Sequence, residues 1–326
     1  MKKVLGIGNA LVDIMISVES DAILDMLGLP KGSMQLVNME RSNAIIEALK
    51  NYKWSRSAGG SVANMIHGLA KLDAPAGYIG SIGEDEMGGH FVKDMINAGV
   101  EPHMIHSSSE TGRVVALVTP DSERTFATFL GSSGELSAEM ISSFNFRNYD
   151  YLMIEGYLVQ NHDLVIKTAQ KGKENGLIVA IDLASYNVVE ANLDFLRTTI
   201  KKYIDIVFAN EEEARAFTGK EPGEALKEIG TLCEIAVVKT GGKGSLIKRG
   251  KEIEKIGVIP VIPVDTTGAG DLYAAGFLYG LINDLPIRKC GELGALLAGN
   301  VIEFMGSKMS NDRWQKIRDD ISSISG

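Results

Sequence analysis

Cysteine and histidine are scarce in this chain of 326 residues, which excludes a disulfide framework and does not favour a zinc centre. The two cysteines, Cys233 and Cys290, lie far apart in apolar stretches, so we expect buried thiols and a reducing compartment. Of the five histidines, His103 and His106 are close in sequence, but no cysteine or second histidine pair accompanies them. We therefore expect a surface loop there rather than a metal site.

An excess of positive charge and long apolar runs are also missing. The formal net charge of −9 argues against a broad surface for nucleic acid or for an anionic membrane. No apolar run approaches the ~20 residues of a membrane span. The apolar start of the chain is interrupted by Gly6, Gly8 and Asn9, and no cleavage site follows it. We expect a buried first strand and a cytoplasmic protein.

The rest of the chain alternates short apolar runs with helix-like stretches. The predicted strands are 4–8, 76–79, 151–154, 178–182, 206–208 and 235–238. The predicted helices are 63–72, 89–98, 163–175, 193–202, 211–218, 272–282 and 312–321. This alternation predicts an α/β fold with a largely parallel sheet covered by helices on both faces. Gly276 and Gly280, one turn apart on an apolar helix, indicate close packing against another element.

Two regions interrupt this alternation with strands that lack helices. The segments 14–18 and 34–37 form one pair and the segments 113–119 and 125–130 form another, and each pair resembles a β-hairpin. A small sheet built from both pairs would form a separate lid over the main domain. We therefore expect a large domain of residues 1–13, 39–110 and 131–326, and a lid of residues 14–38 and 111–130.

The heptapeptide Asp265-Thr266-Thr267-Gly268-Ala269-Gly270-Asp271 stands directly before the apolar helix. Its glycines let the backbone turn sharply, so that N–H groups form a nest for anionic oxygen at a helix start. Asp271 at the end of the nest would accept the proton of a hydroxyl that attacks a bound phosphoryl group. The structural alternative is a glycine-rich turn in which Asp271 only caps the helix.

Two further clusters carry groups suited to sugar hydroxyls. Gly59 and Gly60 allow close backbone approach before a helix, and the amide of Asn64 offers both a donor and an acceptor. Asp13 follows the first strand, where ligands bind in open α/β sheets. The structural alternatives are a loop before a capped helix, for the first cluster, and an aspartate in a turn, for the second.

Later stretches are candidates for binding the phosphate donor and its metal. Asn210 precedes three glutamates that end at Glu213, which form either a solvated helix start or a magnesium ligand acting through water. The stretch 239–244 either approaches a nucleotide or forms a hairpin turn. No Gly-Lys pair is followed by Ser or Thr, so a Walker A loop is absent from the sequence. Arg124 either meets the transferred phosphate when the lid closes or remains a surface arginine.

Together these pieces resemble the PfkB family of carbohydrate and nucleoside kinases, which has the ribokinase-like fold. The heptapeptide 265–271 matches the C-terminal signature of the family, and 59–64 matches the N-terminal one. Asn210-x-x-Glu213 matches its Asn-x-x-Glu motif, and the order and spacing agree over nearly the whole chain. The resemblance implies a three-layer sandwich with a mostly parallel central sheet, a small β-sheet lid, and ATP and Mg²⁺ as cofactors.

The resemblance also implies a role for each matched residue. Asp271 is the catalytic base, and the anion hole is formed by Gly268, Ala269 and Gly270. The acceptor would be bound by Asn9, Asp13, Gly59, Gly60, Asn64 and Arg124. Asn210 and Glu213 would organise the phosphates and Mg²⁺, with Glu213 acting through water. The ATP contacts are Thr240, Gly242, Gly244 and Asn300. Some relatives need K⁺ near the anion hole, in the loop that holds Asp265 and Thr267 here.

Within the family the chain looks nearest to adenosine kinases and their bacterial relatives. The similarity is carried by Gly8, Asn9, Asp13 and the stretch 111–124. The chain has Tyr157-Leu158 where adenosine kinases place two aromatic residues, so Phe126 or Phe129 would have to supply the wall that stacks on a base. A sugar acceptor, as in ribokinases and fructokinases, therefore stays open.

We predict an ATP-dependent kinase that phosphorylates a primary hydroxyl of a ribonucleoside or sugar held between Asp13 and Asn64 under the lid. Exposed lid strands would pair with a second copy to give a dimer, or be covered in a monomer. A nicotinamide-dependent oxidoreductase is a rival suggested by Gly6-x-Gly8, but Leu11 stands where its fingerprint needs a third glycine. A non-catalytic sugar or nucleotide sensor is a second rival, against which the retention of Asp271 argues.

Overall fold

The apolar runs of the sequence form the centre of a nine-stranded sheet in the computed structural model, which describes residues 1–121 and 123–325. The strand order is β14-β13-β12-β11-β10-β9-β1-β5-β6. Neighbouring strands from β12 to β6 are parallel, and β13 and β14 add an antiparallel edge. The strands are β1 Val4–Ile7, β5 Ala76–Gly83, β6 Glu101–Ser107, β9 Tyr151–Ile154, β10 Ile178–Asp182, β11 Ile206–Asn210, β12 Ile235–Lys239, β13 Ser245–Arg249 and β14 Glu252–Ile256. The predicted parallel sheet is confirmed.

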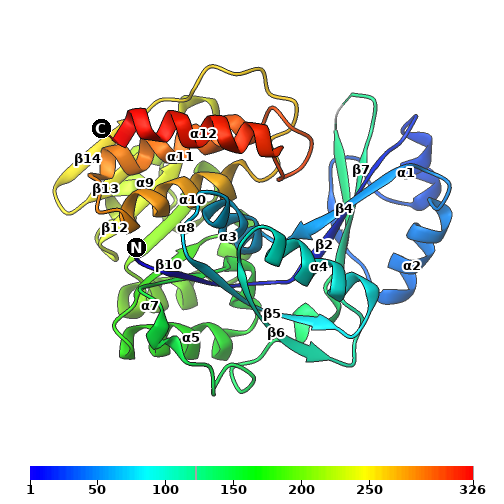
Figure 1. Cartoon of the computed structure of the whole chain (residues 1–326), viewed down its shortest axis with the longest axis horizontal. Coiled ribbons are helices and arrows are strands. Elements are labelled where there is room, and N and C mark those ends of the chain that lie inside the picture. The colour runs from blue at the N-terminus through cyan, green and yellow to red at the C-terminus, as the bar shows by residue number, and fades with distance from the viewer. Residues whose placement is uncertain (122, 326) are drawn as a thin grey trace.

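Helices cover both faces of this sheet, as the alternating sequence predicts. One face packs against α3 Ser61–Lys71, α4 Glu86–Asn97, α10 Ala269–Ile282 and α11 Ile287–Val301, with α12 Asn311–Ser325 outside α11. The other face packs against α5 His162–Glu174, α6 Tyr186–Ala191, α7 Leu193–Tyr203, α8 Glu211–Thr218 and α9 Pro222–Ile229. Figure 1 shows α10, α11 and α12 above the sheet and α5 and α7 below it. Each face has its own hydrophobic cluster, which gives the three-layer architecture.

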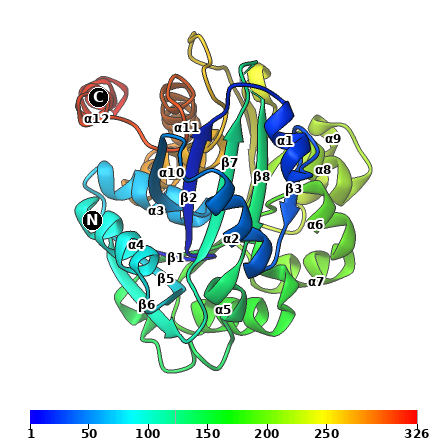
Figure 2. The ribbon, with the colours of Figure 1, turned by 90° about the vertical axis from the view of Figure 1, so that its right-hand side faces the viewer.

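A second sheet has five strands in the order β3-β8-β7-β2-β4. We call this sheet, together with the two helices that cover it, the lid. Its strands are β2 Leu11–Ser17, β3 Met34–Leu36, β4 Trp54–Gly59, β7 Gly112–Val118 and β8 Arg124–Phe129. Helices α1 Ala22–Leu27 and α2 Met39–Ala48 cover one face of this sheet and lie in front of it in Figure 2. The lid stands to one side of the large sheet (Figure 1).

The lid differs from the expected one in two respects. The segments around β2 and β3 do not form a hairpin, because α1 separates them and β3 pairs with β8 instead. The edge strand β4 was not predicted, and β2 already begins at Leu11, so the sheet includes residues that we had assigned to the large domain. The hairpin of β7 and β8 is confirmed. Strand β4 consists largely of small and polar residues, so its sequence gives little indication of a strand.

The expected surface loop at His103 and His106 is wrong. His103 and His106 lie within the strand β6 rather than in a loop, and the ring of His103 is hydrogen-bonded to the hydroxyl of Tyr149 at 2.6 Å. In residues 1–121 and 123–325 no cluster of three His, Cys, Asp or Glu side chains is placed to hold a metal ion. No helix in that same part of the chain has the length and apolar character needed to cross a bilayer.

The two glycines of α10 lie against α11, as their spacing predicts. A Cβ atom on residue 276 would overlap the carbonyl group of Leu293, and one on residue 280 would lie 2.8 Å from Cα of Cys290. Real Cβ atoms essentially never approach other atoms within 3.0 Å, so the interhelical distance requires both glycines. The helix α10, which carries Asp271 in its first turn, is therefore held rigidly against α11.

We expect Gly276→Ala to lower the free energy of unfolding by about 1–3 kcal/mol, because the new methyl group must push α10 away from α11. The matched control is Gly89→Ala, at an exposed site of α4 where a Cβ atom meets nothing within 4 Å. That control should leave stability unchanged or raise it by up to about 1 kcal/mol. Urea unfolding of the three proteins is the measurement, and equal effects of the two substitutions would contradict the packing argument.

Candidate functional site

Five polar side chains lie at the same edge of the large sheet because each belongs to the carboxyl end of a parallel strand. Asn9 follows β1, Glu155 follows β9, Asp182 ends β10, Asn210 ends β11 and Lys239 ends β12. These strands are neighbours in the order β12-β11-β10-β9-β1. Carboxyl ends of parallel strands are where open α/β sheets bind ligands. The sheet thus gathers residues separated by more than two hundred positions in the sequence.

The predicted nest lies at the start of α10, above this edge. Gly268 precedes the helix with φ 76° and ψ −2°, a left-handed conformation that favours glycine. A Cβ atom on residue 268 would also lie 2.8 Å from Cβ of Ser307. Ala269 donates its N–H to the carbonyl of Thr266 at 3.2 Å, and the following N–H groups belong to the first turn, where a helix has unpaired donors. Backbone geometry therefore supports an anion site here.

Asp271 does not cap this helix. It lies in the first turn of α10, one oxygen of its carboxylate accepts a hydrogen bond from Ser61 Oγ at 2.7 Å, and the other accepts one from Asn64 Nδ2 at 3.0 Å. Burial raises the pKa of Asp271 to about 6, although the bonds from Ser61 and Asn64 favour its charged form. The side chain is still partly exposed. It is therefore an ionised, oriented carboxylate at neutral pH, which is the form a general base requires.

Asn64 is held at both ends. Its Nδ2 donates to Asp271 and its Oδ1 accepts a hydrogen bond from Ser307 Oγ at 2.8 Å. The amide expected to bind an acceptor thus also positions the carboxylate. Ser61 and Ser307 were not singled out from the sequence, because serines are common and nothing in their spacing reveals that they meet α10.

The start of α3 is fixed by a buried carboxylate that the sequence analysis missed. Glu155 accepts hydrogen bonds from Asn9 Nδ2 at 2.6 Å and from the backbone N–H of Val62 at 3.2 Å. Burial raises the pKa of Glu155 to about 7. Asn9 therefore directs its amide to Glu155. Gly60, with φ 100°, must lack a side chain, because a Cβ atom there would overlap the carbonyl oxygen of Asn9.

Asp13 lies on β2 of the lid and is partly exposed. Its carboxyl group occupies the space where a Cβ atom on residue 59 would be, so Gly59 is required to accommodate it. Burial raises the pKa of Asp13 to about 7, the charge of Lys308 opposes this rise, and the charge of Asp271 adds to it. Gly59 therefore acts through Asp13, whose carboxylate is placed to accept hydrogen bonds from hydroxyl groups.

Lys308 is a second residue that the sequence analysis missed. Its Nζ atom is buried and has no hydrogen-bond partner among the described residues. Burial lowers its pKa to about 8, although the carboxylates of Asp94 and Asp13 act in the opposite direction. No motif marks this lysine, and its place beside Asp13 follows from the loop after α11.

A cluster of carboxylates surrounds one lysine near the nest. Lys239 Nζ forms an ion pair with Asp182 at 2.8 Å, and a Cβ atom on residue 270 would lie 3.1 Å from the same nitrogen. Burial disfavours the charged form of Lys239, but the carboxylates of Asp182 and Glu213 raise its pKa above the ordinary value. This ammonium group therefore stays charged beside the nest. In the sequence, Lys239 is visible only as the first residue of a glycine-rich stretch.

Asn210 and Glu213 form a reciprocal cap at the start of α8. Asn210 Oδ1 accepts a hydrogen bond from Glu213 N at 2.8 Å, and the Glu213 carboxylate accepts from Asn210 N at 2.7 Å and from Asn210 Nδ2 at 2.6 Å. Burial, with the charge of Asp182, raises the pKa of Glu213 to about 7. The carboxylates of Glu213 and Asp182 act on each other here, and one or two carboxylates suit Mg²⁺, which keeps several waters and binds together with phosphates. The donor set therefore fits the expected ion.

The expected ATP contacts divide into two groups. Thr240 N and Oγ1 both donate to the carbonyl of Gly244, at 2.8 and 3.0 Å, in the turn between β12 and β13. A Cβ atom on residue 242 would meet nothing within 4 Å, so the backbone of this turn is open to a ligand. Asn300, in contrast, donates to the carbonyl of Leu296 at 2.8 Å and accepts from Arg313 at 2.9 Å. Both ends of its amide have protein partners, and its role at adenine stays a prediction.

The face of the lid sheet that carries Asp13 lies toward the large domain, and we call it the site face. Residues paired across neighbouring strands share a face. The register therefore places Met15, Phe126 and Arg124 on the site face together with Asp13. Phe129 lies on the opposite face, where its ring stacks against the guanidinium of Arg113. Of the two phenylalanines considered for the stacking wall, Phe126 alone shares the face of Asp13.

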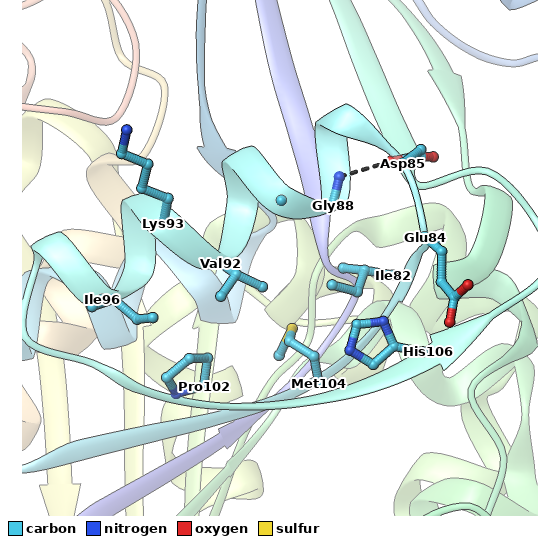
Figure 3. A pocket seen from close by; sticks show the side chains of 12 residues that line it. Ile82, Glu84, Asp85, Gly88, Val92, Lys93, Ile96, Pro102, Met104 and His106 are labelled. Carbon is cyan, nitrogen blue, oxygen red and sulfur yellow. Dashed lines mark hydrogen bonds between the residues drawn. The ribbon is translucent and has the colours of Figure 1, made fainter.

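A hollow of about 770 Å³ lies elsewhere, between α4 and the edge strand β6 (Figure 3). Its floor and walls are mainly apolar, with Ile82, Val92, Ile96, Pro102 and Met104. None of the predicted site residues lines it. The hollow is therefore separate from the carboxyl ends of β1, β9, β10, β11 and β12, where the site residues lie.

The sequence matches the pfkB family carbohydrate kinase profile over residues 34–313. It is 32% identical to adenosine kinase from Sinorhizobium meliloti, whose structure superposes with a TM-score of 0.88 over 98% of this chain and 99% of that chain. It is 30% identical to a probable sugar kinase protein from Rhizobium etli CFN 42, with a TM-score of 0.89 over 99% of both chains. A 5-dehydro-2-deoxygluconokinase from Geobacillus kaustophilus (strain HTA426) is 29% identical over 268 residues, which are 76% of this chain and 80% of that protein.

We expect Lys308→Met to make the protein more stable at pH 7 by about 1–3 kcal/mol, because it removes a buried, unpaired ammonium group. The folded-state pKa of about 8 lies below the ordinary lysine value of 10.5, so the unfolded state binds the proton more tightly. The free energy of unfolding of the parent protein should therefore rise between pH 8 and 10.5 relative to the variant, and the difference should shrink. The control is Lys251→Met at an exposed turn.

Urea unfolding of the parent and both variants from pH 7 to 10 measures this. A Lys308→Met protein that is less stable at pH 7 would mean that the ammonium group stabilises the fold through Asp13.

Proposed function

This chain belongs to the pfkB family of carbohydrate kinases and is an ATP-dependent sugar or nucleoside kinase, and we propose that its acceptor is a ribonucleoside of the adenosine type, phosphorylated on a primary hydroxyl. The observation that carries the catalytic part of the proposal is the Asp271 carboxylate. It stands beside the nest of α10, oriented by Ser61 and Asn64, with its pKa raised to about 6 by burial.

In the proposed mechanism, Asp271 accepts the proton of the acceptor hydroxyl while that oxygen attacks the terminal phosphorus of ATP. The N–H groups at the start of α10 and the ammonium group of Lys239 balance the charge on the transferred phosphoryl group. Asn210 and Glu213 would hold the magnesium ion through water, and the ion supplies charge neutralisation on the phosphates. The open turn between β12 and β13, with Thr240, Gly242 and Gly244, would accept the rest of the nucleotide.

The acceptor would lie between the site face of the lid and the start of α3. Asp13 and Asn64 are the groups proposed to bind its ribose hydroxyls, and Gly60 lets the backbone come close. Met15 and Phe126 on the site face offer an apolar surface that suits a flat base, which supports a nucleoside over a free sugar. The likeness to the Sinorhizobium meliloti adenosine kinase supports the same choice.

A sugar acceptor is the second candidate, because the likeness extends to a probable sugar kinase and to a 5-dehydro-2-deoxygluconokinase. The oxidoreductase rival loses its remaining support: β1 is followed by the strand β2, whereas a dinucleotide fingerprint needs a helix there. The sensor rival leaves unexplained why Asp271 is oriented by two hydrogen bonds beside the nest.

An acceptor panel tests the proposal. Release of ADP from MgATP should be fastest with adenosine among adenosine, guanosine, inosine, ribose, fructose and 5-dehydro-2-deoxygluconate. The product should carry its phosphate on the primary hydroxyl, which ³¹P NMR identifies. Faster turnover with a free sugar than with every nucleoside would replace the nucleoside by the sugar acceptor, and no turnover with any of them would reject both.

We expect Asp271→Asn to lower kcat by at least ~10²-fold, because the amide cannot accept the proton, while the affinity for ATP stays within about twofold. The matched control is Asp163→Asn on α5, which removes an exposed carboxylate paired with Lys167. Steady-state kinetics and ATP titration of both variants measure the two effects. Retained turnover in Asp271→Asn would assign the base to another group.

The pH profile checks the same assignment. The base must be ionised to act, and burial raises the pKa of Asp271 to about 6, so kcat/KM should fall as the pH drops through about 6. A profile that is flat down to pH 4.5 would contradict the assignment.

A further inference from the structure

The guanidinium group of Arg124 is bound by the loop that leads into the nest. Arg124 extends from the start of β8, its Nη2 forms an ion pair with the Asp265 carboxylate, and its Nη1 donates to Thr267 Oγ1. Nη2 also approaches Met305 Sδ at 3.5 Å. One lid side chain therefore contacts both the loop before α10 and the loop after α11.

Asp265 needs a positive partner because its side chain is fully buried. One of its oxygens accepts a hydrogen bond from Thr267 N at 2.6 Å, and the other accepts from Gly306 N and from Arg124. Burying a carboxylate without a counter-charge costs several kcal/mol. Within residues 1–121 and 123–325, Arg124 is the partner of Asp265 in an ion pair. The side chain of Arg124 is itself only 11% exposed.

The family resemblance places a monovalent metal ion in the loop that holds these residues, and their side chains do not fit one here. Such an ion needs oxygen ligands and a negative charge to balance it, and the side-chain oxygens of this loop are those of Asp265, Thr266 and Thr267, of which the Asp265 carboxylate alone is charged. The side chains of Asp265 and Thr267 already accept hydrogen bonds from Arg124. A K⁺ ion beside the guanidinium group would also meet a like charge at hydrogen-bonding distance. The side chains of Asp265 and Thr267 are therefore occupied by an internal cation.

We propose that Arg124 takes the place of a monovalent metal ion in this enzyme, as a positioning residue that neutralises Asp265 and fixes the loop at 265–268. The proposal rests on the proposed function only in treating this loop as part of the anion hole. The cation belongs to the lid, so the charge balance of the loop depends on where β8 lies. A dissolved metal ion would balance Asp265 independently of the lid.

The first test uses the unmodified protein and needs no variant. Its melting temperature without substrate, and its rate of ADP release with the acceptor found by the panel, are measured in equal concentrations of KCl, NaCl and choline chloride. We expect melting temperatures within about 2 °C and rates within about twofold across the three salts. Rates at least fivefold higher in KCl, or a melting temperature at least 5 °C higher, would overturn the proposal. The melting data do not depend on turnover, so they remain decisive if the proposed acceptor is wrong.

The second test removes the internal cation. Arg124→Ala leaves the Asp265 carboxylate buried without a counter-charge and should lower the melting temperature in choline chloride by ~5 °C or more. Either KCl or 20 mM guanidinium chloride should restore part of this loss, because a small cation then enters the space that the side chain leaves. The matched control is Arg56→Ala, whose side chain pairs with the exposed Glu86 at 2.8 Å on β4 of the same lid.

The control should shift the melting temperature by no more than about 2 °C and gain nothing from KCl or guanidinium, since an exposed ion pair contributes little. An unchanged melting temperature in Arg124→Ala would overturn the proposal. The proposal would also be overturned if Arg124→Ala and Arg56→Ala lowered the melting temperature equally and neither KCl nor guanidinium chloride reversed the loss in Arg124→Ala. Arg124→Ala combined with Asp265→Asn provides the closing check, because a neutral residue 265 should make the protein indifferent to added cations.

Discussion

The hydrogen bonds between the start of α3 and the carboxylate of Asp271 are the interaction on which the site depends. Ser61 and Asn64 belong to α3, and Asp271 belongs to α10, so these bonds lock together two helices that arrive from opposite ends of the chain. The position of α3 is set in turn by Glu155, which receives the N–H of Val62 and the amide of Asn9. The position of α10 is set by its glycine contacts with α11. Every other group of the site is arranged around this fixed point.

The site also contains several carboxyl groups whose charged forms are disfavoured by burial. Burial raises the pKa values of Asp13, Glu155, Glu213 and Asp271, each toward neutrality. Lys239 offsets part of this charge through Asp182, and Lys308 offsets part of it at Asp13. Such strained electrostatics are typical of catalytic sites, because groups tuned near neutral pH transfer protons readily. The cluster is thus suited to a ligand that brings its own cation.

The sequence alone was sufficient where local rules decide structure. The strands at 151–154 and 178–182 are buried on both sides and therefore apolar throughout, and the nest needs glycines whose spacing is visible by inspection. The sequence was insufficient where a residue distant along the chain determines the position of a strand or of a side chain. The strand β4 exists because β2 lies beside it, and Asn9 points to Glu155 because β1 and β9 are neighbours. Lys308 carries no local signature at all, since its importance comes from Asp13 across the lid boundary.

Two short connections join the lid to the large domain at the acceptor side of the site. β1 passes into β2 through Gly8, Asn9 and Ala10, and β4 passes into α3 through Gly60. At these junctions Asn9 donates to Glu155, and Gly60 lies against the carbonyl oxygen of Asn9. A rotation of the small sheet about these pivots would move Asp13 relative to Asp271, because Asp271 stays with Ser61 and Asn64 on helices that pack on the large sheet. The position of the small sheet therefore sets the spacing between the Asp13 carboxylate and the base.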